Sequence, residues 1–173
     1  DTINNLYNFL DNYEIDLAIV EAQPHNPKLG YLVLGSDSLV CIMANENPLA
    51  SKSAITWKEL RKEKLILRLP DSETRKLFAS SLKRISESIK DLDIIMEIDN
   101  IATIKNCVSN GLGVSILPLS VCQEDIRKKK LKALPIKNLS MDRQTFIVYH
   151  NDFADQKILQ DILQMYQEKS KII

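Results

Sequence analysis

Two short polar loops carry the side chains of this sequence that are best suited to binding chemistry. Residues 70–74 (PDSET) and 99–103 (DNIAT) each follow a strand-like run and precede a helix-like run. A loop of this kind presents unpaired backbone N–H groups beside hydroxyls and amides, which is typical of a site for a small polar or anionic ligand. The same residue types dominate helix N-caps. The pattern therefore favours two helix caps, and a ligand site shared by the two loops is the second interpretation. Thr2 belongs to the same class of residue at the start of the chain.

Catalytic and metal-binding patterns are weak by comparison. His25 lies in a proline-flanked loop and His150 at the end of a strand-like run, and no H-x-x-x-H, C-x-x-C or paired-carboxylate spacing accompanies them. No nucleophile elbow, Walker-type loop or G-x-G-x-x-G occurs. Cys41, Cys107 and Cys122 form an odd set without a close pair, which suits reduced, buried thiols in a cytoplasm. The sequence therefore predicts no enzyme, no metal and no cofactor.

Composition excludes several other classes of protein. The chain has 173 residues, 45% of them apolar and 27% charged, which is ordinary for a soluble globular protein. Its 23 basic and 23 acidic side chains give zero net charge, so it has no general electrostatic attraction for a phosphate backbone or an anionic bilayer. Its longest uncharged apolar run, residues 111–122, is broken by Pro118 and is too short for a spanning helix.

Helix-period and strand-period segments alternate along the whole chain, which indicates an α/β architecture with mainly parallel strand pairing. Asn110-Gly111 predicts a left-handed stop at the end of the helix that follows Asn100. Arg75 is expected to face solvent or to pair with Asp71. The expected helices are 1–13, 56–60, 71–89, 100–108, 119–126 and 158–166, and the expected strands 15–20, 31–34, 39–44, 64–69, 94–98, 114–117, 131–136 and 144–149.

Four segments together resemble the effector-binding domain of LysR-type transcriptional regulators. No single segment is specific, but their order and spacing extend over nearly the whole chain. The matching segments are FLDNYEIDLAI at 9–19, NPLA at 47–50, TRKLFASSL at 74–82 and VSNGLGVSILP at 108–118.

The resemblance implies a periplasmic-binding-protein-like fold of type 2, in which two α/β subdomains hold a metabolite in the cleft between them. It places residues 1–37 and 118–173 in the first subdomain and 38–117 in the second, with crossings near 36–39 and 117–120. It implies effector contacts from Ser72, Thr74, Asn100 and Ile101 and from Thr2. Glu21 occupies a further contact position, where an acid departs from the family and would repel a carboxylate effector. The resemblance thus implies an effector site formed by Thr2, Glu21, Ser72, Thr74, Asn100 and Ile101.

Family members also carry two further strands and a winged helix-turn-helix ahead of the position where this chain starts, so the resemblance implies an N-terminal truncation and an incomplete first subdomain. The expected function is to sense a small-molecule effector in a bacterial cytoplasm and to transmit the signal to that DNA-binding domain. DNA would be contacted through the absent domain alone, and the full-length protein would form a dimer or tetramer. A solute-binding protein of a transport system is the alternative, and a small elimination enzyme using Asp99 or Glu21 ranks below it.

Overall fold

The chain forms two compact units in the computed structural model, which describes residues 3–21 and 23–171. Unit 1 is built from Asp1–Ser36 and Arg143–Ile173, and unit 2 from Asp37–Asp142. The first boundary differs by one residue from that expected from the sequence. The second differs by 25, because residues 118–142 belong to unit 2 although the sequence placed them in the first subdomain. The division of the chain into two subdomains that bind the effector between them stays a prediction.

Unit 1 is a small sheet with a helix against each of its apolar clusters. Strand β1 pairs antiparallel with β7, with Leu17 opposite Tyr149 and Val20 opposite Phe146. Leu10 of α1 packs with one set of strand residues and Leu159 of α6 with the other. Its elements are α1 (Ile3–Asp11), β1 (Leu17–Val20), the first part of β2 (Leu29–Met43), β7 (Asp142–His150) and α6 (Gln156–Lys171).

Strand β2 runs without interruption through Gly35, where the sequence predicts a break between two strands. Separate strands at 31–34 and 39–44 were expected around Gly35, and this expectation is wrong. A Cβ at Gly35 would lie 2.6 Å from the Tyr166 ring of α6, so this glycine permits close packing of the helix on the strand. The resulting strand continues from unit 1 into unit 2.

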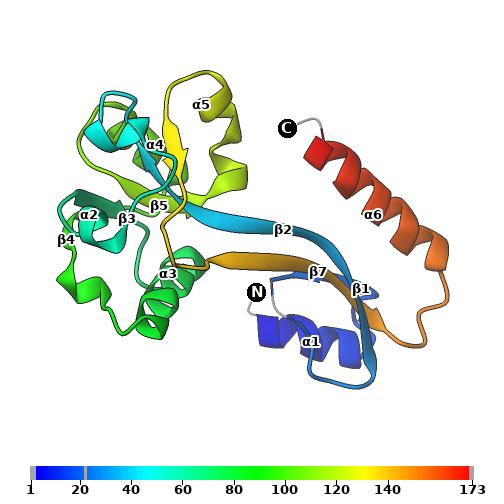
Figure 1. Ribbon diagram of the computed structural model, residues 1–173. Coiled ribbons are helices and arrows are strands. Elements are labelled where there is room, and N and C mark those ends of the chain that lie inside the picture. The colour runs from blue at the N-terminus through cyan, green and yellow to red at the C-terminus, as the bar shows by residue number, and fades with distance from the viewer. Residues whose placement is uncertain (1–2, 22, 172–173) are drawn as a thin grey trace. The chain divides into compact units, whose positions relative to one another are not determined.

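Unit 2 contains the short strands and helices that surround the two polar loops (Figure 1). Its named elements are the second part of β2, η1 (Pro48–Ser51), α2 (Trp57–Leu60), β3 (Lys64–Leu67), α3 (Glu73–Arg84), η2 (Ile89–Asp91), β4 (Asp93–Glu97), α4 (Ile101–Ser109), β5 (Ser115–Pro118), η3 (Leu119–Val121), α5 (Gln123–Arg127) and β6 (Lys132–Leu134).

Strand pairing in the protein is mostly antiparallel, which corrects the expectation of mainly parallel pairing. β2 pairs antiparallel with both β5 and β6, as β1 does with β7, whereas β3 and β4 are parallel. The alternation of helix and strand periods does not reveal which strands become neighbours, and for that reason it could not predict this outcome.

Strand β3 is buried on both faces and separates two apolar clusters of unit 2. Leu65 packs with one cluster, which includes Phe78 of α3, and Ile66 with the other, which includes Ile104 of α4. All four side chains are at most 1% exposed. A short, continuously apolar strand is the sequence form expected for a strand covered on both sides. The two helices that start at the polar loops are thereby anchored to the same strand.

The helix ends follow the local sequence closely. Thr56 forms a capping box with Glu59, as expected for the start of the helix that buries Trp57 and Leu60. Gly111, at φ 74°, ends α4 in the left-handed conformation that was expected there. No helix within the described residues is long and apolar enough to cross a membrane.

Candidate functional site

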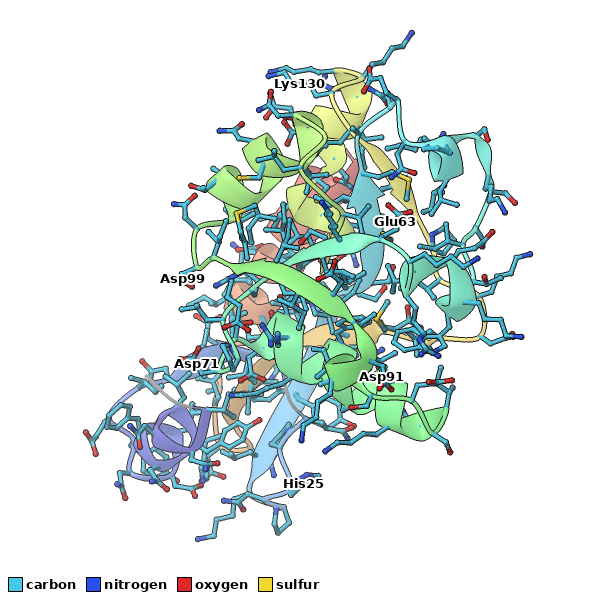
Figure 2. All side chains as sticks on the ribbon, turned by 90° about the vertical axis from the view of Figure 1, so that its left-hand side faces the viewer. His25, Glu63, Asp71, Asp91, Asp99 and Lys130 are labelled. Atoms are coloured by element: carbon cyan, nitrogen blue, oxygen red, sulfur yellow. The ribbon has the colours of Figure 1, made fainter. Side chains whose placement is uncertain are left out.

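The parallel pairing of β3 and β4 brings the two polar loops together at one end of these strands. The backbone N–H of Ile98 donates to the carbonyl of Leu67 at 2.9 Å, which extends the pairing to the start of both loops. Helix α3 begins after the first loop and α4 after the second. Figure 2 shows Asp71 and Asp99, one from each loop, at the same end of the pair.

Ser72 and Asn100 are the N-caps of these helices, as the sequence predicts. The Ser72 hydroxyl accepts from the backbone N–H of Arg75 at 3.2 Å, and the Asn100 amide oxygen accepts from that of Thr103 at 2.9 Å. Each cap satisfies one of the N–H groups that a helix leaves without an intrahelical acceptor in its first turn. The first N–H groups of two neighbouring helices therefore remain available at the same place, where their dipoles favour an anion.

Thr74 and Ile101 occupy the first turns of the two helices. Thr74 is 7% exposed, and its hydroxyl makes no hydrogen bond with the residues that the structure describes. Ile101 is partly buried against the apolar cluster around Ile104. The loops thus combine a free hydroxyl with an apolar contact, next to the two caps.

Two arginines link the segments next to the two loops. Arg75 Nη1 lies 2.7 Å from Glu97 Oε1 and donates to the Arg68 carbonyl at 2.9 Å. Arg68 Nη2 lies 2.7 Å from Asp99 Oδ1. The Arg75 side chain is only 11% exposed, so the expectation that it faces solvent or pairs with Asp71 is wrong. Sequence reasoning did not single out Arg68, although a basic residue at the end of an apolar strand could have indicated it.

The Arg68 guanidinium has unused hydrogen-bonding capacity. Its Nε is buried and has no hydrogen-bond partner among the described residues. The acid that pairs with its Nη2, Asp99, is 74% exposed, whereas the Arg68 side chain is 18% exposed. Buried guanidinium N–H groups nearly always have a partner, and an exposed carboxylate is easily replaced by another anion.

The two remaining predicted site residues cannot be assigned to this place. Thr2 lies outside the described residues. Glu21 belongs to unit 1, where its Oε1 lies 2.8 Å from Arg143 Nη1. The repulsive charge expected for Glu21 is therefore compensated by an arginine of its own unit.

Other reactive side chains in the described residues do not form a catalytic or metal centre at these loops. No cluster of three or more His, Cys, Asp or Glu side chains within residues 3–21 and 23–171 could hold a metal ion. All three cysteines are free, and burial raises the pKa of the thiols of Cys41 and Cys122. The arrangement provides hydrogen-bond donors for a bound molecule, and each of its two arginines is paired with a carboxylate.

Comparisons with known proteins identify the relatives of this chain. The family profile described as the LysR substrate binding domain matches residues 1–171. The HTH-type transcriptional regulator CbbR of Cereibacter sphaeroides is 29% identical over 143 residues, which are 83% of this chain and 46% of that protein. The chain spans about half the length of the curated relatives it matches.

Solved structures share the fold. The regulatory domain of CcmR from Synechocystis PCC6803, in complex with 2-PG, aligns with a TM-score of 0.74 and 23% identity over 94% of this chain and 78% of that one. The effector-binding domain of QuiR, in complex with shikimate, aligns with a TM-score of 0.68 and 22% identity over 98% of this chain and 79% of that one. These similarities confirm the predicted α/β fold class, the periplasmic-binding-protein-like fold of type 2.

Proposed function

The chain belongs to the LysR substrate-binding domain family, and from that premise we propose that it senses a small-molecule effector on behalf of a transcriptional regulator. The observation that carries the proposal is the meeting of two capped helix starts and two largely buried arginines at the ends of β3 and β4. Such a site binds a ligand and has no group arranged to transform it.

The effector that fits these loops is a small organic acid. Unpaired N–H groups of α3 and α4, the Thr74 hydroxyl and the Arg68 guanidinium are all donors, and they favour a carboxylate or phosphate group. The Asp99 carboxylate lies 2.7 Å from Arg68 Nη2, in the position that the anionic group of the ligand would take. We infer that the effector displaces Asp99 from Arg68. Two structural relatives, in complex with 2-PG and with shikimate, support an acidic effector.

Regulation follows if the effector binds one arrangement of the domain more tightly than another. A ligand shifts such an equilibrium only by its difference in affinity for the two states. In the proposed full-length protein the shift reaches a winged helix-turn-helix domain, which alone contacts DNA, within a dimer or tetramer in the cytoplasm. The zero net charge of this chain supports the assignment of DNA binding to another domain.

The alternative of a solute-binding protein for transport has less support. Curated relatives across most of this chain are named transcriptional regulators, among them regulators of RuBisCO genes. An enzyme function has no support from these names or from the groups at the loops. The sensing role is therefore the function that both the geometry and the relatives favour.

Calorimetric titration of the 173-residue chain with 2-PG, shikimate and a panel of small organic acids tests the proposal. We expect at least one acid to bind, and the Thr74→Val variant to weaken that binding by roughly tenfold or more through the loss of one buried hydrogen bond. Valine keeps the volume of threonine at this 7% exposed position, so the loss is specific to the hydroxyl.

Ser80→Ala is the matched control, because Ser80 is exposed on the same helix and, among the described residues, its hydroxyl donates only to the Leu77 carbonyl. It should leave binding unchanged. Arg68→Gln should weaken the same acid further, since it removes the positive charge. Binding that is insensitive to both Thr74→Val and Arg68→Gln would place the effector site elsewhere and refute the proposal.

A further inference from the structure

A cavity lies in unit 2 at the opposite end of the elements that carry the two polar loops, 70–74 and 99–103, which we call the effector loops. It has a volume of about 660 Å³ and is formed by the turn after β2, the residues leading into β3 and the α4–β5 turn. β3 and α4 each have one end at the effector loops and the other at this cavity. Figure 2 shows Glu63, of the cavity, at the far end of β3 from Asp71 and Asp99. The volume lies in the range typical of small-molecule sites.

Two glycines shape one wall of the cavity. Gly111 ends α4 at φ 74°. A Cβ on Gly113 would lie 2.5 Å from the Lys64 carbonyl oxygen, so only glycine allows the turn to approach β3 this closely. Leu112, between them, is 50% exposed and lines the cavity together with Pro48. The turn therefore offers an apolar surface to whatever occupies the cavity.

One carboxylate of the cavity is held in a fixed orientation. Asn47 accepts from the backbone N–H of Leu49 through Oδ1 at 2.8 Å and donates through Nδ2 to Glu63 Oε2 at 3.0 Å. The other carboxylate oxygen of Glu63 has no partner among the described residues. The C-terminal end of α4, with Ser109 and Asn110 on the cavity wall, adds partial negative charge. This part of the cavity favours a cationic group.

Lysines supply the opposite charge next to that carboxylate. Lys62 and Lys64 flank Glu63 in the sequence, and both line the cavity. Neither ammonium group forms an ion pair with a residue that the structure describes, and the same holds for the carboxylate of Glu46 on the cavity wall. The cavity thus presents unpaired charges of both signs beside an apolar surface.

We propose that this cavity is a second ligand site, distinct from the effector loops, and that it binds an apolar α-amino acid. The ammonium group of the ligand pairs with Glu63 and its carboxylate with Lys62 or Lys64, while its side chain contacts Leu112 and Pro48. A simple amine would leave the lysines without a partner, and a simple acid would leave Glu63 without one. The cavity therefore favours a zwitterion over either compound.

Titration of the ¹⁵N-labelled 173-residue chain with L-leucine, followed by backbone amide NMR, tests the proposal. We expect saturable shifts of the Gly111, Leu112 and Gly113 amides, with little change at Ala102 and Thr103 near the effector loops. Isopentylamine and 4-methylpentanoate each lack one of the two charged groups of leucine, and each should bind about tenfold more weakly or worse.

Two variants distinguish a specific site from surface association. Glu63→Gln keeps the acceptor for Asn47 and removes the charge, and the double variant Lys62→Gln/Lys64→Gln changes two exposed side chains. Each should weaken leucine binding about tenfold or more, whereas Glu87→Gln, away from the cavity, should not. Absence of saturable shifts with leucine, equal affinity for the three compounds, or affinity that neither variant changes would overturn the proposal.

Discussion

Replacing Arg75 by methionine should destabilise unit 2 far more than replacing the neighbouring Lys76 by the same residue. Both are α3 residues in an ion pair of similar length, 2.7 Å to Glu97 for Arg75 and 2.8 Å to Glu73 for Lys76. They differ in burial: the Arg75 side chain is 11% exposed and the Lys76 side chain 55%. Methionine retains the apolar stem and a similar helix propensity, so each substitution removes mainly the charged group.

The expected losses follow from these contacts. The Arg75–Glu97 pair is intermediate between an exposed and a buried ion pair, because Glu97 is 42% exposed, and its loss should cost about 1–2 kcal/mol. The hydrogen bond from Arg75 to the Arg68 carbonyl should add about 1 kcal/mol. Arg75→Met is therefore expected to lower the free energy of unfolding by about 2–3 kcal/mol, and Lys76→Met by about 0.2–0.5 kcal/mol.

Urea unfolding followed by tryptophan fluorescence measures both values. Trp57 is the single tryptophan of the chain and is 8% exposed in unit 2, so its emission reports the unfolding of that unit even if unit 1 unfolds separately. A double-mutant cycle with Glu97→Gln should attribute about 1–2 kcal/mol to the pair. Equal losses for Arg75→Met and Lys76→Met, or a coupling near zero, would refute the conclusion that the Arg75–Glu97 pair holds α3 to β4.

Other substitutions test separate parts of unit 2. Asn100→Ala should lower the free energy of unfolding by about 1 kcal/mol through the loss of the α4 cap, and Asn100→Asp should restore most of it in the same urea assay. Hydrogen bonds from Lys52 and Thr56 lower the pKa of Glu59 from 4.5 to about 2. The stability that Glu59 contributes is therefore fully present above pH 4.5 and is lost as the pH falls from 4.5 to about 2. Glu59→Gln should flatten this part of an acid titration followed by Trp57 emission. Gly113→Ala should cost about 1–3 kcal/mol or more, because its Cβ meets a backbone carbonyl that cannot move aside, and wild-type stability would refute this packing. Cys107 is the one partly exposed cysteine, so Ellman's reagent should modify a single thiol rapidly, and Cys107→Ser should abolish this rapid reaction. Fast reaction of a second thiol would show that Cys41 and Cys122 are not buried deeply enough to raise the pKa of their thiols.

The sequence by itself determined those features that depend on a few neighbouring residues. Ser72, Asn100 and Thr56 start helices because each side chain accepts from a backbone N–H three residues later, a contact that needs no distant partner. The same local logic placed the stop at Gly111 and the apolar strand at Leu65 and Ile66. The order of such segments also carried the family resemblance that the later comparisons confirmed.

Only the tertiary structure decided which of these segments meet and how their charges are shared. The parallel register of β3 and β4 places Arg68 beside Asp99, and the course of α3 brings Arg75 to Glu97. Nothing in the spacing of these residues along the chain specifies such pairs, because ion pairs form between whichever side chains the packed apolar strands bring close. The use of Gly35 was likewise not predictable from its neighbours, because the side chain that packs against it is Tyr166, far along the chain in α6.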